Sequence, residues 1–189
     1  SHAMPDEHAI VPQDLHRLEG DLAVPRRLDD QIAMLRVNIE ALTHLTRLML
    51  PAMLERGRGG VINVASTAGF QPGPYMSVYY ASKAYVLSLS EALAEETKGT
   101  GVTVTCLAPG PTRTEFQQRA GAKRAWVSQL NPGPAVDVAR IGWNGFRSGK
   151  VIVVPGTTNR IFATLVQIVP RVVARKATAL LNDRQMAAK

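Results

Sequence analysis

A tyrosine and a lysine stand one helical turn apart in the segment SVYYASKAYVLSL, residues 77–89, which otherwise holds mostly small and apolar residues. The segment contains no glycine or proline, so we expect a helix on which Tyr79 and Lys83, at positions i and i+4, share one face. A phenol is too weak an acid for proton transfer at neutral pH, and a nearby ammonium group stabilises the phenolate. The pair is therefore suited to proton transfer to or from an alcohol or carbonyl oxygen.

Two further polar residues are candidates to join this pair. Ser66 follows the apolar run GGVINVA, and open α/β sheets bind ligands beyond the carboxyl ends of their strands. Its hydroxyl can donate to the substrate oxygen. Asn38 lies within or beside the apolar stripe of a long predicted helix, where a buried amide needs partners, and a water held by Asn38 would link Lys83 to solvent. The structural alternatives are a surface pair, a turn serine and a polar helix position.

The elements that must position these residues alternate between strands and helices. Short runs rich in β-branched residues and bounded by glycine predict buried strands. These strands are expected at 59–66, 101–110 and 149–156. Helices are predicted over 26–54, where Pro51 marks a kink or the final turn, and over 78–98, which Gly99 caps. This alternation predicts a doubly wound α/β domain with a parallel sheet.

Composition narrows the class of protein. The chain has 189 residues, of which 46% are hydrophobic, with 22 Lys+Arg against 15 Asp+Glu, which suits one domain with a sizeable core. No apolar run reaches the roughly 18 residues that cross a bilayer, and the basic residues lack the interleaved aromatics of a nucleic-acid groove. The histidines show no ligand spacing, so no metal site is assigned. The single cysteine, Cys106, lies in a predicted strand, which indicates a core residue and a reducing, cytoplasmic setting.

These residues together resemble the short-chain dehydrogenase/reductase family. The resemblance rests on Asn38 in RVNIEAL, Ser66 in NVAS, the Tyr79 and Lys83 pair, and the segment PGPTRT after the second strand. It implies a Rossmann-like fold, in which Asn38, Ser66, Tyr79 and Lys83 are catalytic, and it selects Tyr79 over Tyr80. It also implies positions that bind a nicotinamide dinucleotide. These are Asp14, Leu15, Tyr79, Lys83, Pro109, Gly110, Thr112 and Thr114.

The resemblance further implies an NAD(P)-dependent oxidoreductase that interconverts a carbonyl and a secondary alcohol. The segments PGPTRTEF and VVPGTTNR favour NADP over NAD. Phe116 and Trp126 lie in the variable substrate region and suggest an apolar substrate. A homodimer or homotetramer is expected through the two long helices. The rival interpretation is a reductase remnant that acts as an interaction module and binds no dinucleotide.

The sequence departs from the family in its N-terminal half. It lacks the glycine-rich turn that cradles the cofactor pyrophosphate and the NNAG strand, so the predicted sheet is incomplete. Residues 4–189 are interpreted as one domain, with 1–3 as an expression scar. Either the sequence joins ordered parts of a longer enzyme, with a break between 16 and 25 and a structure free of dinucleotide, or the chain is truly this short. We favour the first, since the second leaves a strand edge exposed through which the chain would associate.

The C-terminal segment NRIFATLVQIVPRVVARKATALLN predicts a helix over 161–169 that Pro170 interrupts. Basic residues follow it at Arg171, Arg175 and Lys176. A basic amphipathic helix can lie on a membrane surface. We favour instead a flap over the substrate pocket or a contact between subunits.

Overall fold

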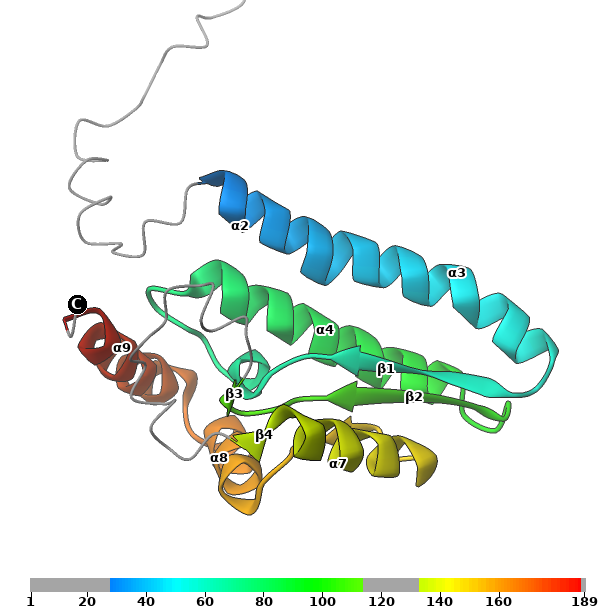
Figure 1. The fold of residues 1–189 in the computed structure, drawn as a ribbon. Coiled ribbons are helices and arrows are strands. Elements are labelled where there is room, and N and C mark those ends of the chain that lie inside the picture. The colour runs from blue at the N-terminus through cyan, green and yellow to red at the C-terminus, as the bar shows by residue number, and fades with distance from the viewer. Residues whose placement is uncertain (1–27, 114–132, 188–189) are drawn as a thin grey trace, which may run out of the picture.

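The computed structural model describes residues 28–113 and 133–187. Within these ranges three parallel strands form the central sheet in the order β1-β2-β5, and these are β1 (Gly59–Val64), β2 (Val102–Leu107) and β5 (Ile152–Val153). The register pairs Gly59 with Val102 and Val64 with Leu107. The carboxyl ends of β1 and β2 therefore meet at one edge of the sheet (Figure 1). This arrangement confirms the predicted parallel α/β fold, incomplete in its N-terminal half.

Helices pack on both faces of this sheet (Figure 1). On one face α2 (Leu28–Leu35), η1 (Arg36–Ala41) and α3 (Leu42–Glu55) continue one another as a long helix, and α4 (Ser77–Glu96) lies beside it. On the other face lies α7 (Ala135–Arg147), which the sequence analysis did not predict. The centre of the long helix, η1, is π-helical rather than α-helical.

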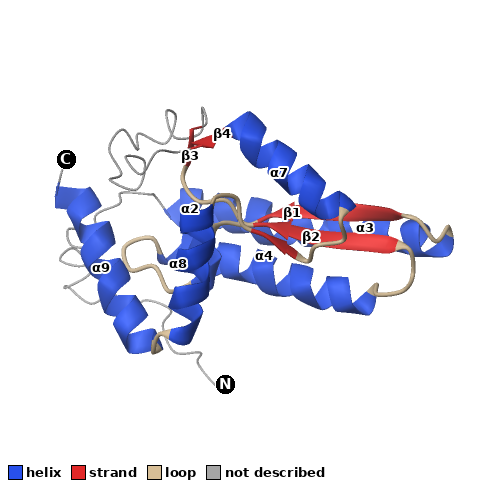
Figure 2. Ribbon diagram, turned by 90° about the horizontal axis from the view of Figure 1, so that it is seen from below, coloured by secondary structure: helices blue, strands red, loops and turns tan. Residues whose placement is uncertain are grey.

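Short elements complete the described chain. The 3₁₀ helix η2 (Thr67–Phe70) follows β1, and β3 (Thr112–Arg113) pairs in parallel with β4 (Gly133–Pro134). Two C-terminal helices follow β5, namely α8 (Thr157–Ile168) and α9 (Arg171–Ala187), and Figure 2 shows them together at one end of the molecule. The predicted interruption at Pro170 is confirmed, because this residue separates the two helices.

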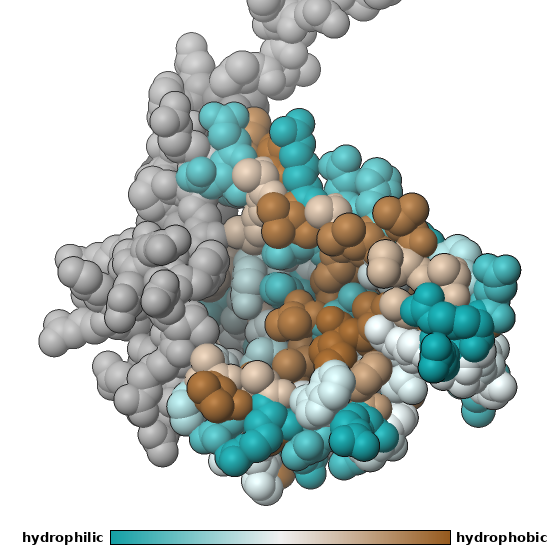
Figure 3. All heavy atoms as spheres, turned by 45° about the vertical axis from the view of Figure 1, so that its right-hand side comes forward, coloured by the Kyte–Doolittle hydropathy of each residue, from teal (hydrophilic) through white to brown (hydrophobic). Residues whose placement is uncertain are grey.

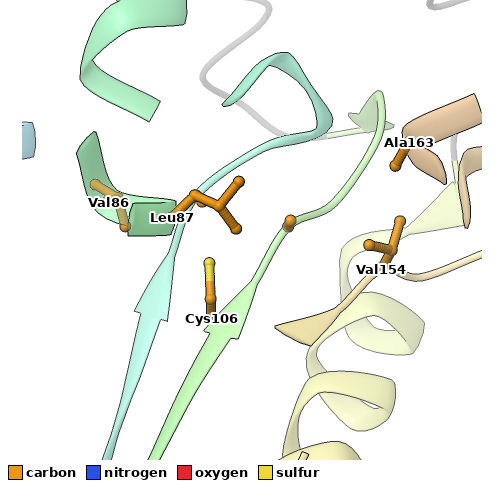
Figure 4. Close-up of a cluster of buried hydrophobic side chains, with 7 residues drawn as sticks. Val86, Leu87, Cys106, Val154 and Ala163 are labelled. Carbon is orange, nitrogen blue, oxygen red and sulfur yellow. The ribbon is translucent and has the colours of Figure 1, made fainter. Parts of the chain in front are cut away.

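The core lies between the sheet and the helices in two clusters. Figure 4 shows the first, in which Val86 and Leu87 of α4 lie near Cys106 of β2, with Val154 and Ala163 beyond them. The second gathers under α3 and the end of α4. Its buried members are Leu50, Met53, Leu93, Val102 and Val104. Cys106 is fully buried, which confirms the expectation of a small core residue.

Three buried polar side chains, Thr46, Asn63 and Ser90, form a hydrogen-bonded bridge within the core. The Asn63 side chain of β1 donates from Nδ2 to Ser90 Oγ over 3.1 Å and accepts at Oδ1 from Thr46 Oγ1 over 3.4 Å. Ser90 in turn donates to the Val86 carbonyl over 2.7 Å. The bridge therefore joins α3, β1 and α4 with its polar groups satisfied, as buried polar groups require.

The long helix is less buried than its apolar stripe suggested. Leu28 is 72% exposed, and Leu35, Ile39 and Leu42 are only half-buried. Within the described ranges β1 also pairs with a strand on one side only. Figure 3 shows apolar side chains gathered across the face on which the long helix lies. The segment EHAIVPQDL at 7–15, whose sequence predicts a further strand, and the predicted break between 16 and 25 lie outside the described residues.

Candidate active site

Lys83 and Tyr79 lie side by side on α4, as their spacing predicts. Lys83 Nζ is 6.0 Å from the centroid of the Tyr79 ring and donates to the Val64 carbonyl, the last of β1, over 3.1 Å. Both side chains are half-buried. Burial lowers the pKa of Lys83, and the nearby Cys106 acts in the opposite direction. The ammonium group is thus held at the carboxyl end of the strand, next to a phenol.

Tyr80, the neighbouring tyrosine, has a different environment. Burial raises the pKa of its hydroxyl, which hydrogen bonding with Asn182 partly offsets. Its ring packs so tightly on Gly73 that a side chain at that glycine would overlap it. The two tyrosine rings meet edge to face, with their centroids 6.0 Å apart. Tyr80 is therefore built into the packing between α4 and α9, which favours Tyr79 as the reactive phenol.

Ser66 begins the turn that leaves β1. Its Oγ accepts from the Ala68 amide over 3.2 Å and so caps η2, which is the structural role of a turn serine. The same hydroxyl still carries a proton that it can donate to a ligand. Two backbone contacts fix the turn near the other site residues. Thr67 N donates to the Pro109 carbonyl over 2.9 Å, and a Cβ on Gly69 would lie 2.7 Å from the Lys83 carbonyl oxygen.

Asn38 reaches α4 from the π-helical segment η1. Its Nδ2 donates to Ser82 Oγ over 3.1 Å, and Ser82 Oγ donates to the Tyr79 carbonyl over 2.8 Å. Asn38 is thus linked to the turn of α4 that carries both Tyr79 and Lys83. The sequence analysis did not identify Ser82. The sequence signal that could have identified Ser82 is its position between Tyr79 and Lys83. The structural signal is the π-helical turn that carries Asn38, since such turns often occur at functional sites.

The loop after β2 carries three of the predicted cofactor positions. Pro109 and Gly110 are half-buried, and Thr112 Oγ1 donates to the Gly110 carbonyl over 3.0 Å. A Cβ on Gly110 would lie 2.5 Å from the Asn159 side chain near the start of α8, so a larger residue there would displace that side chain. The remaining predicted positions, Asp14, Leu15 and Thr114, lie outside the described residues, as do Phe116 and Trp126.

The described members of the predicted site lie on η1 and α4 and on the segments that follow β1 and β2. Lys83 is held at the carboxyl end of β1 by the Val64 carbonyl, and the Thr67 amide ties the loop with Pro109 to the turn that follows β1. The sequence holds no glycine-rich turn to cradle a pyrophosphate. Among the described residues, no group of three or more His, Cys, Asp or Glu is placed to hold a metal ion.

The fold and the site define a class of protein, an α/β domain with a tyrosine–lysine pair at the carboxyl edge of a parallel sheet. The chain belongs to the short chain dehydrogenase family, whose profile matches residues 26–125. It is 39% identical over 139 residues to sulfoacetaldehyde reductase 2 of Chromohalobacter salexigens, which covers 70% of this chain and 52% of the relative. It is also 42% identical over 78 residues to the ketoacyl reductase HetN of a Nostoc species, covering 41% of this chain and 27% of the relative.

Solved structures show the same fold. A short-chain dehydrogenase from Sphingobium yanoikuyae in complex with NADPH superposes with a TM-score of 0.64 at 30% identity, covering 74% of this chain and 54% of that one. A 7β-hydroxysteroid dehydrogenase superposes with a TM-score of 0.70 over 81% of this chain and 60% of that one, and its 21% identity shows the fold alone. The chain spans about half the length of these structures.

Proposed function

We propose that the chain carries the catalytic half of an NADP-dependent reductase that interconverts a carbonyl and a secondary alcohol on an apolar substrate. The observation that supports this most is the position of Lys83, whose ammonium is held 6.0 Å from the Tyr79 ring by a hydrogen bond to the Val64 carbonyl. A cation fixed beside a phenol stabilises the phenolate, which is the form that remains after the phenol gives up its proton.

Each residue of the site has one role in this proposal. Tyr79 gives its proton to the substrate oxygen during reduction, and Ser66 donates a hydrogen bond to the same oxygen and orients it. Lys83 stabilises the phenolate that Tyr79 becomes. Asn38 acts through Ser82 on the turn of α4 between these residues. The nicotinamide, when bound, supplies the hydride.

The cofactor would be held by this chain at its nicotinamide end. We assign that role to Lys83 and to the loop with Pro109, Gly110 and Thr112, with Thr114 as its continuation. Asp14 and Leu15 are proposed to flank the adenine. The preference for NADP over NAD is supported by the two sequence segments given above and by the NADPH bound in the Sphingobium yanoikuyae enzyme.

Two single substitutions test the proposal. Tyr79→Phe removes the proton donor and one oxygen atom, and we expect kcat/KM for ketone reduction with NADPH to fall by about 10²–10⁴. Tyr80→Phe is the matched control, because Tyr80 packs between α4 and α9, and it should stay within a few-fold of the unchanged protein. Circular dichroism confirms that both variants fold. If Tyr79→Phe kept its activity, Tyr79 would not be the proton donor.

The missing glycine-rich turn favours a second candidate, an interaction module that binds no dinucleotide. Titration of NADPH fluorescence with the purified protein separates the two. Saturable binding that Lys83→Met weakens supports the reductase, whereas no binding up to millimolar NADPH supports the module. A homodimer or homotetramer through the long helix and α4 fits either function, and sedimentation at micromolar concentration measures it.

A further inference from the structure

The two C-terminal helices, α8 and α9, present small residues to the rest of the protein. Ala163 of α8 is buried in the first core cluster with Val154. On α9, Ala174, Thr178 and Asn182 recur every fourth residue and are buried, and Asn182 Nδ2 donates to the Pro74 carbonyl over 2.7 Å. The inner face of this helix pair is therefore already packed against the fold.

The larger apolar residues of the same helices face outward. On α8, Ile161, Leu165 and Ile168 follow a spacing of four and three, which places them on one helical face, and they are 55%, 55% and 76% exposed. On α9 the exposed apolar residues are Val172, Val173 and Leu180. The sequence favoured a flap over the substrate pocket or a contact between subunits, and either would cover such residues. In the described structure the buried residues of the two helices are Ala163, Ala174, Thr178 and Asn182, and Val166 and Leu181 are half-buried.

The charged residues of α8, and of α9 as far as Asn182, are all basic. From Val138 to Asn182 the sequence contains no Asp or Glu. Around the outward apolar residues lie exposed basic side chains, and these are Arg160, Arg171, Arg175 and Lys176. The exposed apolar residues of the long helix differ in this respect, because acidic and basic side chains alternate around them, with Asp29, Asp30 and Glu40 among the acids.

We propose that the outward face of α8 and α9 docks on an anionic phospholipid surface. Helices with one apolar face and flanking basic residues lie in the plane of the lipid interface, with the apolar side chains at the boundary of the acyl chains. Lysine and arginine near the surface are attracted by anionic headgroups. No described helix is long and apolar enough to cross a membrane.

A second copy of the chain fits this face less well than a lipid surface. Pairing two such faces would bring together two sets of exposed arginine and lysine side chains, and the stretch from Val138 to Asn182 supplies no carboxylate to lie between them. Like charges at a contact repel one another and suppress association. An anionic surface instead supplies the countercharge together with the apolar boundary. The inference concerns binding to lipid and does not depend on the proposed reductase activity.

Vesicle flotation tests the proposal. The purified protein is mixed with vesicles of phosphatidylcholine alone or of phosphatidylcholine with 30% phosphatidylglycerol, at 0.1 M and 0.5 M salt. We expect binding to the anionic vesicles, which falls at the higher salt because the attraction is screened. Leu165→Glu and Ile168→Glu together should reduce binding at least tenfold. Leu48→Glu, at a leucine of α3 that is 74% exposed, is the control and should leave binding unchanged.

Charge and self-association complete the test. Arg171→Gln with Lys176→Gln should lower the partition coefficient by about fivefold per charge. Equal binding to both kinds of vesicle, or no binding by the folded protein, overturns the proposal. The proposal is also overturned if the double variant Leu165→Glu, Ile168→Glu changes the sedimentation coefficient of the lipid-free protein but not its flotation. That result would mean that a second copy of the chain covers this face.

Discussion

α4 and the long helix of α2, η1 and α3 lie side by side on one face of the sheet, but they are held in different ways. α4 buries Val86 and Leu93 completely, and its buried serines, Ser82 and Ser90, are both hydrogen-bonded. The long helix has no buried residue between Leu28 and Ala41, and Leu48 in α3 is 74% exposed. Complete burial of these side chains therefore fixes α4, whereas the first half of the long helix is at most half-buried and bonds to α4 through Asn38.

This difference matters for the site because the two helices contribute to it unequally. α4 supplies Tyr79 and Lys83 from a rigid, buried support. The long helix supplies Asn38 alone, and hydrogen bonds from Asn38 to Ser82 and between Thr43 and Tyr85 attach it to α4. Four predictions follow from the comparison, in order of decreasing effect.

Shortening one leucine on each helix gives the largest contrast. Leu93→Ala leaves a cavity in the second core cluster and should lower the free energy of unfolding by about 2–5 kcal/mol. Leu48→Ala removes the same atoms from an exposed position and should change it by less than about 0.5 kcal/mol. Urea denaturation measures both. Equal losses of unfolding free energy would show that the long helix is packed as firmly as α4 and would contradict the difference between the two helices.

The second largest loss of stability is expected at the buried bridge of Asn63, Ser90 and Thr46. Asn63→Ala leaves Ser90 and Thr46 without their amide partner, so we expect a loss of about 1–3 kcal/mol. Asn144→Ala, at an exposed asparagine of α7, is the control and should be nearly neutral. A loss in Asn63→Ala no larger than that of the control would mean that the bridge does not join the two helices energetically.

A double-mutant cycle measures the contact between Asn38 and Ser82. Asn38→Ala, Ser82→Ala and the double variant should give a coupling free energy of about 0.5–1.5 kcal/mol, the range of a single hydrogen bond. The thermal unfolding of the four proteins provides the values. Additive losses would show that η1 is held to α4 by something other than this bond.

The smallest expected effect is the pH dependence that Lys83 gives to the stability of the fold. Burial lowers its pKa in the folded protein below the usual lysine value of 10.5, so the protonated side chain reduces stability at neutral pH. As the pH rises through the lowered pKa toward 10.5, the folded protein releases this proton before the unfolded chain does, and the penalty is relieved. The unchanged protein should therefore gain stability relative to Lys83→Met across that window. A pH-independent difference would show that Lys83 is equally solvated in both states.

The sequence predicted the parts of the fold that depend on local patterns. Glycine-bounded apolar runs located β1 and β2 within two or three residues at each end. The third strand is shorter than predicted, since only Ile152 and Val153 pair with β2 and the rest of the run extends past the ladder. The i to i+4 spacing placed Tyr79 beside Lys83, because that relation is fixed by helix geometry alone.

The parts that the sequence did not predict depend on contacts between elements. α7 contains Gly142 and Gly145, which argue against a helix when read alone. In the structure Gly142 lies against Leu107 and Gly145 against Val153, so each glycine lets the helix approach the sheet closely. The residue types around Asn38 do not distinguish a π-helical turn from an α-helical one, and in the structure the Asn38 side chain bonds to Ser82 of the neighbouring helix.

The hydrogen bond from the Thr67 amide to the Pro109 carbonyl joins two loops that the chain itself separates by a helix and a strand. One of these loops begins with the candidate substrate-orienting serine, and the other carries candidate cofactor contacts. When a ligand orders one loop, the hydrogen bond also restrains the other loop. The second loop then loses less conformational entropy when its own ligand binds. Two ligands that meet at this edge of the sheet would then strengthen each other's binding without any change in shape.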